Sequence, residues 1–227
     1  MNLKPKINIA IDGAAATGKS TLAKRLAKEL NYKYIDSGAM YRALTYVALQ
    51  QNKKKPFDSK KLIASLSNIR LKFENFEGEQ HILLNDIDIT KAIRDPQINA
   101  LVSRVAAIKE VRQFLVNLQQ QLGKDKGVVM DGRDIGTVVF PDAECKFYLS
   151  ATPEIRAQRR FDEQQKTGIK STFEKVLENV IMRDHLDASR AHSPLIKASD
   201  ALEIDVSHKT IDEVFDQMLK HLQNLNC

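Results

Sequence analysis

The chain is poor in cysteine and aromatic residues, and it has no tryptophan. Cys145 lies in an apolar run and Cys227 is the last residue, so neither belongs to a Cys-x-x-Cys pair or a metal-ligand cluster. Aromatic residues make up only 6% of the chain, so stacking platforms for single-stranded nucleic acid are not evident. No apolar run approaches the ~18 residues of a membrane span, and residues 1–6 lack the apolar core of a secretory signal. We therefore expect a cytoplasmic protein in a reducing compartment.

What the chain does contain is enough apolar material for one moderately large globular unit. Hydrophobic residues make up 43% of its 227 positions. The formal net charge of +6 favours an anionic partner, which charge alone leaves open between nucleic acid and a small polyphosphate. The basic run at residues 53–55, beside Pro56, is interpreted as a solvated connection.

The most informative segment joins an apolar run at residues 7–12 to the pattern Gly-x-x-x-x-Gly-Lys-Ser. In such a loop successive backbone N–H groups converge on phosphate oxygens, the lysine reaches the β- and γ-phosphates, and the serine hydroxyl can bind Mg²⁺. The following helix points its positive end at the same anion. The sequence therefore predicts an ATP-binding loop made by Gly13, Ala14, Ala15, Ala16, Thr17, Gly18, Lys19, Ser20 and Thr21, with Ser20 as the metal residue.

Short apolar runs alternate with longer amphipathic ones, which is typical of a parallel sheet covered by helices. The predicted strands are residues 7–12, 33–36, 128–131, 146–150 and 201–206. Ligands of such sheets gather at the carboxyl ends of the strands. We therefore expect the phosphate loop, residues 36–38 and residues 131–134 to line one cleft.

Residues 69–90 break this alternation with a period of two and with turn residues, which predicts a small inserted antiparallel meander. Asp95 and Pro96 then supply the N-cap and first-turn proline of a helical region that reaches Leu122.

Arginines are grouped at helical spacing, as phosphoryl transfer requires for charge neutralisation and positioning. Arg156, Arg159 and Arg160 share one helix face after Pro153. Arg183, Asp187 and Arg190 are predicted to share another, with the carboxylate between two guanidiniums. Either set could also be a solvated surface with ordinary ion pairs, but the phosphate loop in the same chain favours a catalytic role.

None of the five histidines is one of the motif residues named above, so no base is evident to deprotonate an alcohol acceptor. A phosphate monoester needs no base, because its second pKa is about 6 and its oxygens are already anionic at neutral pH. The sequence favours a phosphate acceptor, although Asp134 keeps a hydroxyl acceptor possible.

Taken together, these motifs resemble bacterial cytidylate kinases along nearly the whole chain. The resemblance rests on the phosphate loop, residues 35–42 (Ile-Asp-Ser-Gly-Ala-Met-Tyr-Arg), the meander, residues 131–141 (Asp-Gly-Arg-Asp-Ile-Gly-Thr-Val-Val-Phe-Pro) and the Arg183, Asp187, Arg190 set. It implies a three-layer P-loop α/β fold with a five-stranded parallel sheet, a small antiparallel insertion and a helical lid. It also implies Mg²⁺-dependent transfer of the ATP γ-phosphoryl group to CMP or dCMP.

The resemblance further implies roles for individual residues. The catalytic group would be Lys19, Arg133, Arg156, Arg159 and Arg160. The acceptor nucleotide would be bound by Asp36, Ser37, Tyr41, Arg42, Ser103, Arg112, Arg133, Asp134, Arg183, Asp187 and Arg190. Within that set, Ser37, Arg42 and Arg133 would hold the phosphate, and Arg183 and Asp187 the sugar. Arg190 would add positive charge near the phosphates.

The base would be read by Ser103, Arg112 and Asp134. A carboxylate that accepts and a guanidinium that donates complement the cytosine edge, whereas uracil would place a carbonyl against the carboxylate. Asp134 could instead only brace Arg133. Ser103 and Arg112 are nine positions apart, which is half a turn out of phase at about 3.6 residues per turn. Both can reach one base only if the helix breaks between them, and no Pro or Gly marks a break there.

The expected division is a core at 1–60, an inserted nucleotide-binding part at 61–100, more core at 101–151, a lid with substrate-binding helices at 152–192, and a terminal core segment at 193–227. The expected partners are ATP and CMP or dCMP, with no nucleic acid or membrane, and the protein is expected to be a monomer. Three alternatives remain open: a kinase for another monophosphate such as UMP or AMP, or for a small hydroxyl compound; a regulatory nucleotide-binding switch; and a nucleic-acid-stimulated ATPase.

Overall fold

The computed structural model describes residues 5–51, 57–76, 79–166 and 168–225. The chain forms two compact units, one from Met1–Ile35 with Leu122–Cys227 and one from Asp36–Gln121. The expected connection at residues 53–56 and the second cysteine, Cys227, lie outside the described residues. None of the described helices is long and apolar enough to cross a membrane.

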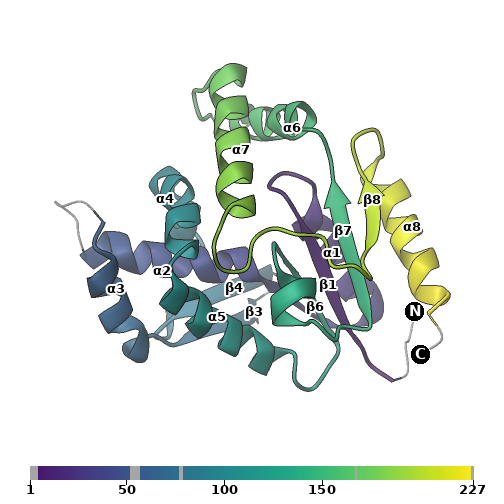
Figure 1. The fold of residues 1–227 in the computed structure, drawn as a ribbon, viewed down its shortest axis with the longest axis horizontal. Coiled ribbons are helices and arrows are strands. Elements are labelled where there is room, and N and C mark those ends of the chain that lie inside the picture. Colours follow the sequence, from purple (N-terminus) through teal and green to yellow (C-terminus); the bar gives the residue numbers. More distant parts are fainter. Residues whose placement is uncertain (1–4, 52–56, 77–78, 167, 226–227) are drawn as a thin grey trace. The chain divides into compact units, whose positions relative to one another are not determined.

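A five-stranded parallel sheet organises the first unit, which confirms the predicted fold class (Figure 1). Its strands stand in the order β2 (Lys33–Asp36), β6 (Val128–Gly132), β1 (Asn8–Gly13), β7 (Cys145–Ser150) and β8 (Leu202–Asp205). All six residues of β1 are buried, as expected for a central strand of a parallel sheet. Asp12, near the end of β1, is opposite Gly132 on one side and Tyr148 on the other.

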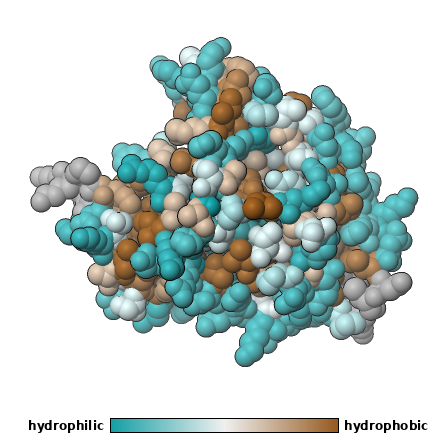
Figure 2. All heavy atoms as spheres, viewed as in Figure 1, coloured by the Kyte–Doolittle hydropathy of each residue, from teal (hydrophilic) through white to brown (hydrophobic). Residues whose placement is uncertain are grey.

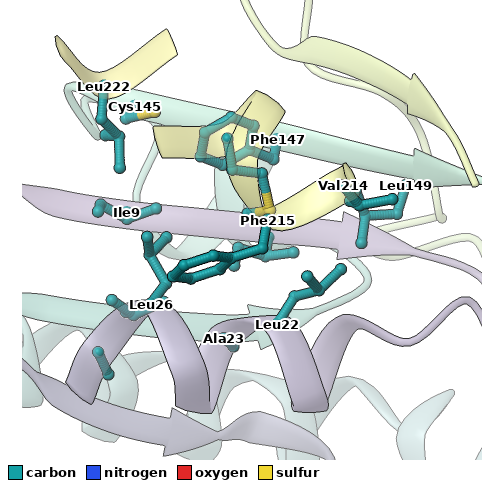
Figure 3. Close-up of a cluster of buried hydrophobic side chains, with 14 of the residues drawn as sticks. Ile9, Leu22, Ala23, Leu26, Cys145, Phe147, Leu149, Val214, Phe215 and Leu222 are labelled. Atoms are coloured by element: carbon teal, nitrogen blue, oxygen red, sulfur yellow. The ribbon is translucent and has the colours of Figure 1, made fainter. Parts of the chain in front are cut away.

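The first unit's main core forms where two helices pack on this sheet. Helix α1 (Lys19–Leu30) contributes Leu22, Ala23 and Leu26, and α8 (Ile211–Gln223) contributes Val214, Phe215 and Leu222. Figure 3 shows these side chains gathered around Ile9 of β1 and Phe147 of β7. Because β1 and α1 are both held in this core, the loop between them has rigid ends.

Two further helices follow β7 (Figure 1), and they have a small core of their own. In α6 (Pro153–Lys166) and α7 (Phe173–Ala188), Ala157 packs with Val176 and Val180, and the Phe161 and Phe173 rings meet edge to face at 6.3 Å. Figure 2 shows hydrophobic atoms along α7, where Ile181 and Met182 are half exposed. The pair therefore packs largely by itself rather than as part of the main core.

The second unit contains the predicted meander, which is confirmed as an antiparallel sheet of β3 (Leu71–Phe76), β4 (Glu79–Leu84) and β5 (Ile87–Asp88). Its helical elements are α2 (Ser37–Gln51), α3 (Ser59–Ser65), η1 (Leu66–Asn68), η2 (Ala92–Arg94), α4 (Pro96–Ala106) and α5 (Lys109–Leu122). The expected insertion at 61–100 lies inside this unit, between α2 and the end of α4. Asp95 caps α4 by accepting from the Gln97 N–H, as predicted.

The helical region that reaches Leu122 is broken after Ala106, although no Pro or Gly lies there. The buried side chain of Arg112 reaches back so that its Nη1 donates to the Ala106 carbonyl at 3.1 Å. This bond satisfies one of the carbonyls that a helix end leaves without an intrahelical partner. The guanidinium also lies 5.2 Å from the centre of the Tyr41 ring on α2. The side chain of Arg112, six positions further along, rather than a helix-breaking residue, stabilises the break.

Candidate active site

The phosphate loop leaves β1 in a backbone conformation that only glycine tolerates at two positions. A Cβ on Gly13 would lie 2.2 Å from the Leu149 carbonyl oxygen of β7. Gly18 has a φ of 86° at the N-cap of α1, in the left-handed region that other residues rarely adopt. The predicted strand, loop and helix are therefore present, and the N-terminus of α1 opens onto the loop.

Lys19 is buried at the start of α1, and its Nζ donates to the Ala14 carbonyl and to Thr17 Oγ1. Burial and the repulsion of Arg133 lower the pKa of Lys19 to about 7. The carboxylates of Asp131 and Asp12 oppose this shift. A negative charge placed beside this lysine would favour its charged form.

The carboxylate of Asp131, which was not predicted to bind the metal, lies beside Ser20. The Ser20 hydroxyl donates to Asp131 Oδ2 at 2.8 Å, and the Tyr34 hydroxyl donates to Asp131 Oδ1 at 2.8 Å. A hydroxyl and a carboxylate are oxygen ligands of the kind Mg²⁺ prefers, with nucleotide phosphates supplying others. The described residues contain no cluster of three His, Cys, Asp or Glu side chains that could hold a metal ion. The signal in the sequence was a carboxylate at the end of the strand next to β1.

The arginine that follows β6 pairs with α7. Arg133 Nε donates to Asp187 Oδ2 at 2.9 Å, and Arg190 Nη1 lies 3.9 Å from Asp187 Oδ1. Burial alone would raise the pKa of Asp187, but the Arg133 and Arg190 guanidiniums hold it below its ordinary value. The carboxylate thus lies between guanidiniums, and it organises a compact positive cluster.

The prediction that Arg183, Asp187 and Arg190 share one helix face is wrong for Arg190. Helix α7 ends at Ala188, where Ser189 Oγ donates to the His185 carbonyl and the Leu195 N–H donates to the Asp187 carbonyl. These bonds satisfy carbonyls of the last turn, so the helix stops before Arg190.

The three arginines of α6 have different environments. Arg156 is buried and forms a bidentate ion pair with Asp184 of α7. Its Nη1 lies 3.5 Å from the Ala15 carbonyl oxygen of the phosphate loop. Arg159 donates to the Val206 carbonyl after β8 at 2.6 Å. Burial and the nearby Arg133 lower the pKa of Arg160, whereas Glu163 raises it. Arg156 therefore connects both helices of the pair to the phosphate loop, and Arg160 lies within the field of Arg133.

Asp134 occupies the N-cap position of a π-helix, η3 (Ile135–Val139), and is buried. Its backbone carbonyl accepts from the N–H groups of Val138 and Val139. Its side chain makes no capping hydrogen bond. π-Helical turns are rare in proteins as a whole, and those that occur are often at functional sites.

The remaining candidates belong to the second unit. Asp36 Oδ2 accepts from Arg42 Nη2 at 2.8 Å, and Asp36 Oδ1 accepts from the Ala39 N–H at the start of α2. Although burial alone would raise the pKa of Asp36, Arg42 and this N–H lower it. Ser37 and Tyr41 are buried on the same helix, and Ser103 is buried on α4. The break after Ala106, which the spacing of Ser103 and Arg112 required, is present.

The phosphate loop, the buried lysine and the arginine cluster on a parallel sheet together define a P-loop phosphotransferase. Residues 9–224 match the model of the cytidylate kinase family. The chain belongs to this family.

Individual relatives agree with this assignment. The chain is 50% identical over 224 residues to a protein of Flavobacterium psychrophilum named cytidylate kinase, covering 97% of this chain and 99% of that relative. It is 49% identical over 209 residues to a cytidylate kinase of Enterococcus faecalis, covering 92% of each. A solved structure of an uncharacterized protein from Eubacterium ventriosum shares the fold, with a TM-score of 0.50 and 12% identity over 96% of this chain and 98% of that one.

Proposed function

We propose that this protein transfers the γ-phosphoryl group of ATP to CMP and dCMP, forming CDP or dCDP and ADP. The observation that carries this proposal is the similarity to relatives named cytidylate kinase over nearly their whole length. The geometry of the first unit supports the chemistry, because a phosphate loop, a buried lysine and a cluster of arginines supply the positioning and charge neutralisation that phosphoryl transfer requires.

On the donor side, the backbone N–H groups of residues 13–21 and the N-terminus of α1 bind the ATP phosphates. Lys19 Nζ exchanges its bonds to Ala14 and Thr17 for phosphate oxygens, where its charge stabilises the group in transfer. Ser20 and Asp131 are the residues that would hold Mg²⁺. The ion would supply positive charge that neutralises the nucleotide phosphates.

On the acceptor side, Arg133, Ser37 and Arg42 hold the phosphate of the monophosphate. Arg183 and Asp187 hold the sugar, and Arg190 adds positive charge. The acceptor oxygen is an anion at neutral pH and needs no protein base, because the second pKa of a phosphate monoester is about 6. This matches the sequence, in which no histidine is among the residues assigned to the site.

Asp134, Ser103 and Arg112 read the base. The Asp134 carboxylate accepts from the cytosine amino group, and with uracil it would meet a carbonyl instead. A buried mismatch of this kind costs about 1–3 kcal/mol, which is roughly a 5- to 150-fold preference for CMP over UMP.

Residues 152–192, which include the helix pair α6 and α7, act as a lid over the transferred group. Its own small core, built around Ala157, Val176 and Val180, allows it to move as a body. Closure brings Arg156, Arg159 and Arg160 to the phosphates and excludes water that would otherwise accept the phosphoryl group.

One panel of acceptors tests the proposal. ATP and Mg²⁺ are supplied with CMP, dCMP, UMP, AMP, GMP, dTMP or shikimate, and ADP formation is measured. CMP and dCMP should be the best acceptors, with UMP distinctly poorer. A higher rate with AMP or shikimate would contradict the proposal, and stimulation by RNA or DNA rather than by any mononucleotide would identify a nucleic-acid-dependent ATPase.

A further inference from the structure

Asp12 is a buried carboxylate to which the proposed mechanism gives no role. It lies at the end of β1, directly before the phosphate loop, and is only 5% exposed. Its Oδ1 accepts from the Ile135 N–H at 2.8 Å, and its Oδ2 accepts from the Gly136 N–H at 2.7 Å. Both oxygens are thus used to hold one short stretch of backbone, 124 positions further along the chain.

That stretch is the first turn of η3, the π-helix that begins after Asp134. The first N–H groups of a helix have no partner within the helix, and a side chain at the N-cap usually accepts from one of them. The Asp134 side chain does not do so, and Asp12 satisfies two of these donors from a neighbouring strand instead. Asp12 therefore caps η3 from another strand, and the Asp134 side chain is not used as the cap.

Gly136 permits this close approach. A Cβ there would lie 3.3 Å from Asp12 Oδ2 and 3.1 Å from the side-chain Cδ of Lys146. Both distances are shorter than ordinary van der Waals contact. A larger residue at this position would require the turn, the Asp12 carboxylate or the Lys146 side chain to shift by a few tenths of an ångström.

Burial in this position disfavours the charged form of the Asp12 carboxylate. Burial raises the pKa of Asp12 to about 7, against the two N–H donors that lower it. Asp134 adds a like charge, which raises the pKa further. Local costs of this kind are typical of functional sites.

We propose that Asp12 is a positioning residue for acceptor recognition: it holds the backbone of residues 133–136 in a fixed place relative to the phosphate loop. Asp12 is adjacent to Gly13 in the same strand, so one rigid carboxylate connects the donor loop to the turn that presents Arg133 and Asp134. This inference rests on the proposed function, in which those two residues bind the acceptor phosphate and the base.

The variant Asp12→Asn tests the proposal with little change of volume. An amide oxygen can still accept one N–H, but the amide NH₂ faces the other donor, so one of the two bonds is lost. The amides of Ile135 and Gly136 should exchange with solvent faster in the ligand-free protein. The CMP/UMP ratio of kcat/KM should fall roughly fivefold or more, as expected for one misplaced buried polar contact. KM for CMP should rise more than KM for ATP, because no Asp12 bond to the loop backbone is broken and the lost Asp12 charge acts on ATP only through Lys19.

Asn8→Ala is the matched control. Asn8 is on the same strand, is 4% exposed, and donates through Nδ2 to the Gly123 carbonyl at 2.8 Å. Its loss should lower Tm by a comparable amount and leave the CMP/UMP ratio and the two amides unchanged. Gly136→Ala provides a second variant that keeps Asp12 and displaces the turn, so it should lower the ratio even if Asp12→Asn does not fold.

The outcomes separate the inference from the proposed function. If the wild type prefers CMP, but both variants keep its CMP/UMP ratio while Tm falls, Asp12 is only structural and the inference is overturned. If the wild type does not phosphorylate CMP, the proposed function fails. In that case unchanged exchange of the Ile135 and Gly136 amides in Asp12→Asn would overturn the anchoring role as well.

Discussion

Arg133 Nε lies 2.9 Å from Asp187 Oδ2, so the motif that follows β6 is bonded directly to the last turn of α7. The Asp187 side chain is 7% exposed and the Arg133 side chain is 21% exposed. Because the pair is largely buried, it keeps the Arg133 side chain in one orientation before any acceptor binds. The arginine that binds the acceptor phosphate in the proposed mechanism is therefore preorganised by a carboxylate 54 positions away.

Replacing Asp187 by asparagine should destabilise the fold in a pH-dependent way. The pKa of Asp187 lies below its ordinary value of 3.8 in the folded protein, so its contribution to stability is present above about pH 4 and is lost as pH falls through the folded pKa. At pH 7 the variant should lose about 3–5 kcal/mol, because the guanidiniums are left uncompensated. Denaturant unfolding of both proteins between pH 2 and 7 measures this. A difference that stayed constant down to pH 2 would contradict it.

Lys19→Met should lower kcat by roughly 10²–10³-fold with little loss of stability, because the lysine acts on charge that develops on the transferred group. Steady-state kinetics at saturating ATP and a thermal melt provide the measurement. The control is Lys28→Met, an exposed lysine in the last turn of the same helix, which should leave kcat unchanged. Near-normal turnover in Lys19→Met would show that the loop does not perform the proposed chemistry.

ATP binding should be accompanied by proton uptake at Lys19. The pKa of this lysine is about 7 without nucleotide, so at pH 8 it is mostly neutral, and phosphate oxygens beside it favour the charged form. Calorimetric titration with ATP and Mg²⁺ at pH 8, in buffers of different ionisation enthalpy, should show uptake approaching one proton. Lys19→Met should abolish the buffer dependence. Equal heats in all buffers for the wild type would show that Lys19 does not change its protonation.

Asp134→Asn should lower the CMP/UMP ratio of kcat/KM by roughly 5- to 150-fold, mainly through loss on CMP, because the amide gains donors that can meet the uracil carbonyl. Asp142→Asn, an exposed change in the same segment, is the control and should behave as wild type. If Asp134 only braced Arg133, both acceptors would weaken together, since they share the phosphate. An unchanged ratio would remove Asp134 from the base-reading set.

Hydrogen exchange should detect closure of the α6 and α7 pair. Amides across residues 153–168 should exchange more slowly once a bisubstrate analogue joining adenosine and cytidine through phosphates is added. Amides of α8 (Ile211–Gln223), which is packed in the main core, provide the internal reference and should not change. Identical exchange in α6 with and without the analogue would rule out the lid.

Much of the fold could be predicted from local sequence. Five apolar runs predicted the five parallel strands to within one residue at each end, and the period of two in residues 69–90 predicted the antiparallel sheet. The phosphate loop could be recognised because its function depends on backbone geometry, which Gly13 and Gly18 determine at their own positions. The acceptor motifs could be recognised only as a resemblance to a family.

Two local predictions needed the tertiary structure. Nothing in residues 106–109 signals the end of α4, because a buried guanidinium from the next helix and the Tyr41 ring stabilise the break. Helical spacing placed Arg190 on α7, but the helix ends at Ala188, and the Leu195 N–H from the segment that follows binds the Asp187 carbonyl of the last turn.

The sequence by itself determined the strands, the phosphate loop and the identity of the charged residues, because the apolar pattern of a strand and the backbone conformation of a tight loop depend on neighbouring residues. Only the tertiary structure decided which group each charged side chain binds. Asp131 lies beside Ser20 from 111 positions away, Arg133 is paired with Asp187, and Asp12 caps a π-helix. These choices depend on which segments pack together, and packing is the result of burying apolar surface from the whole chain.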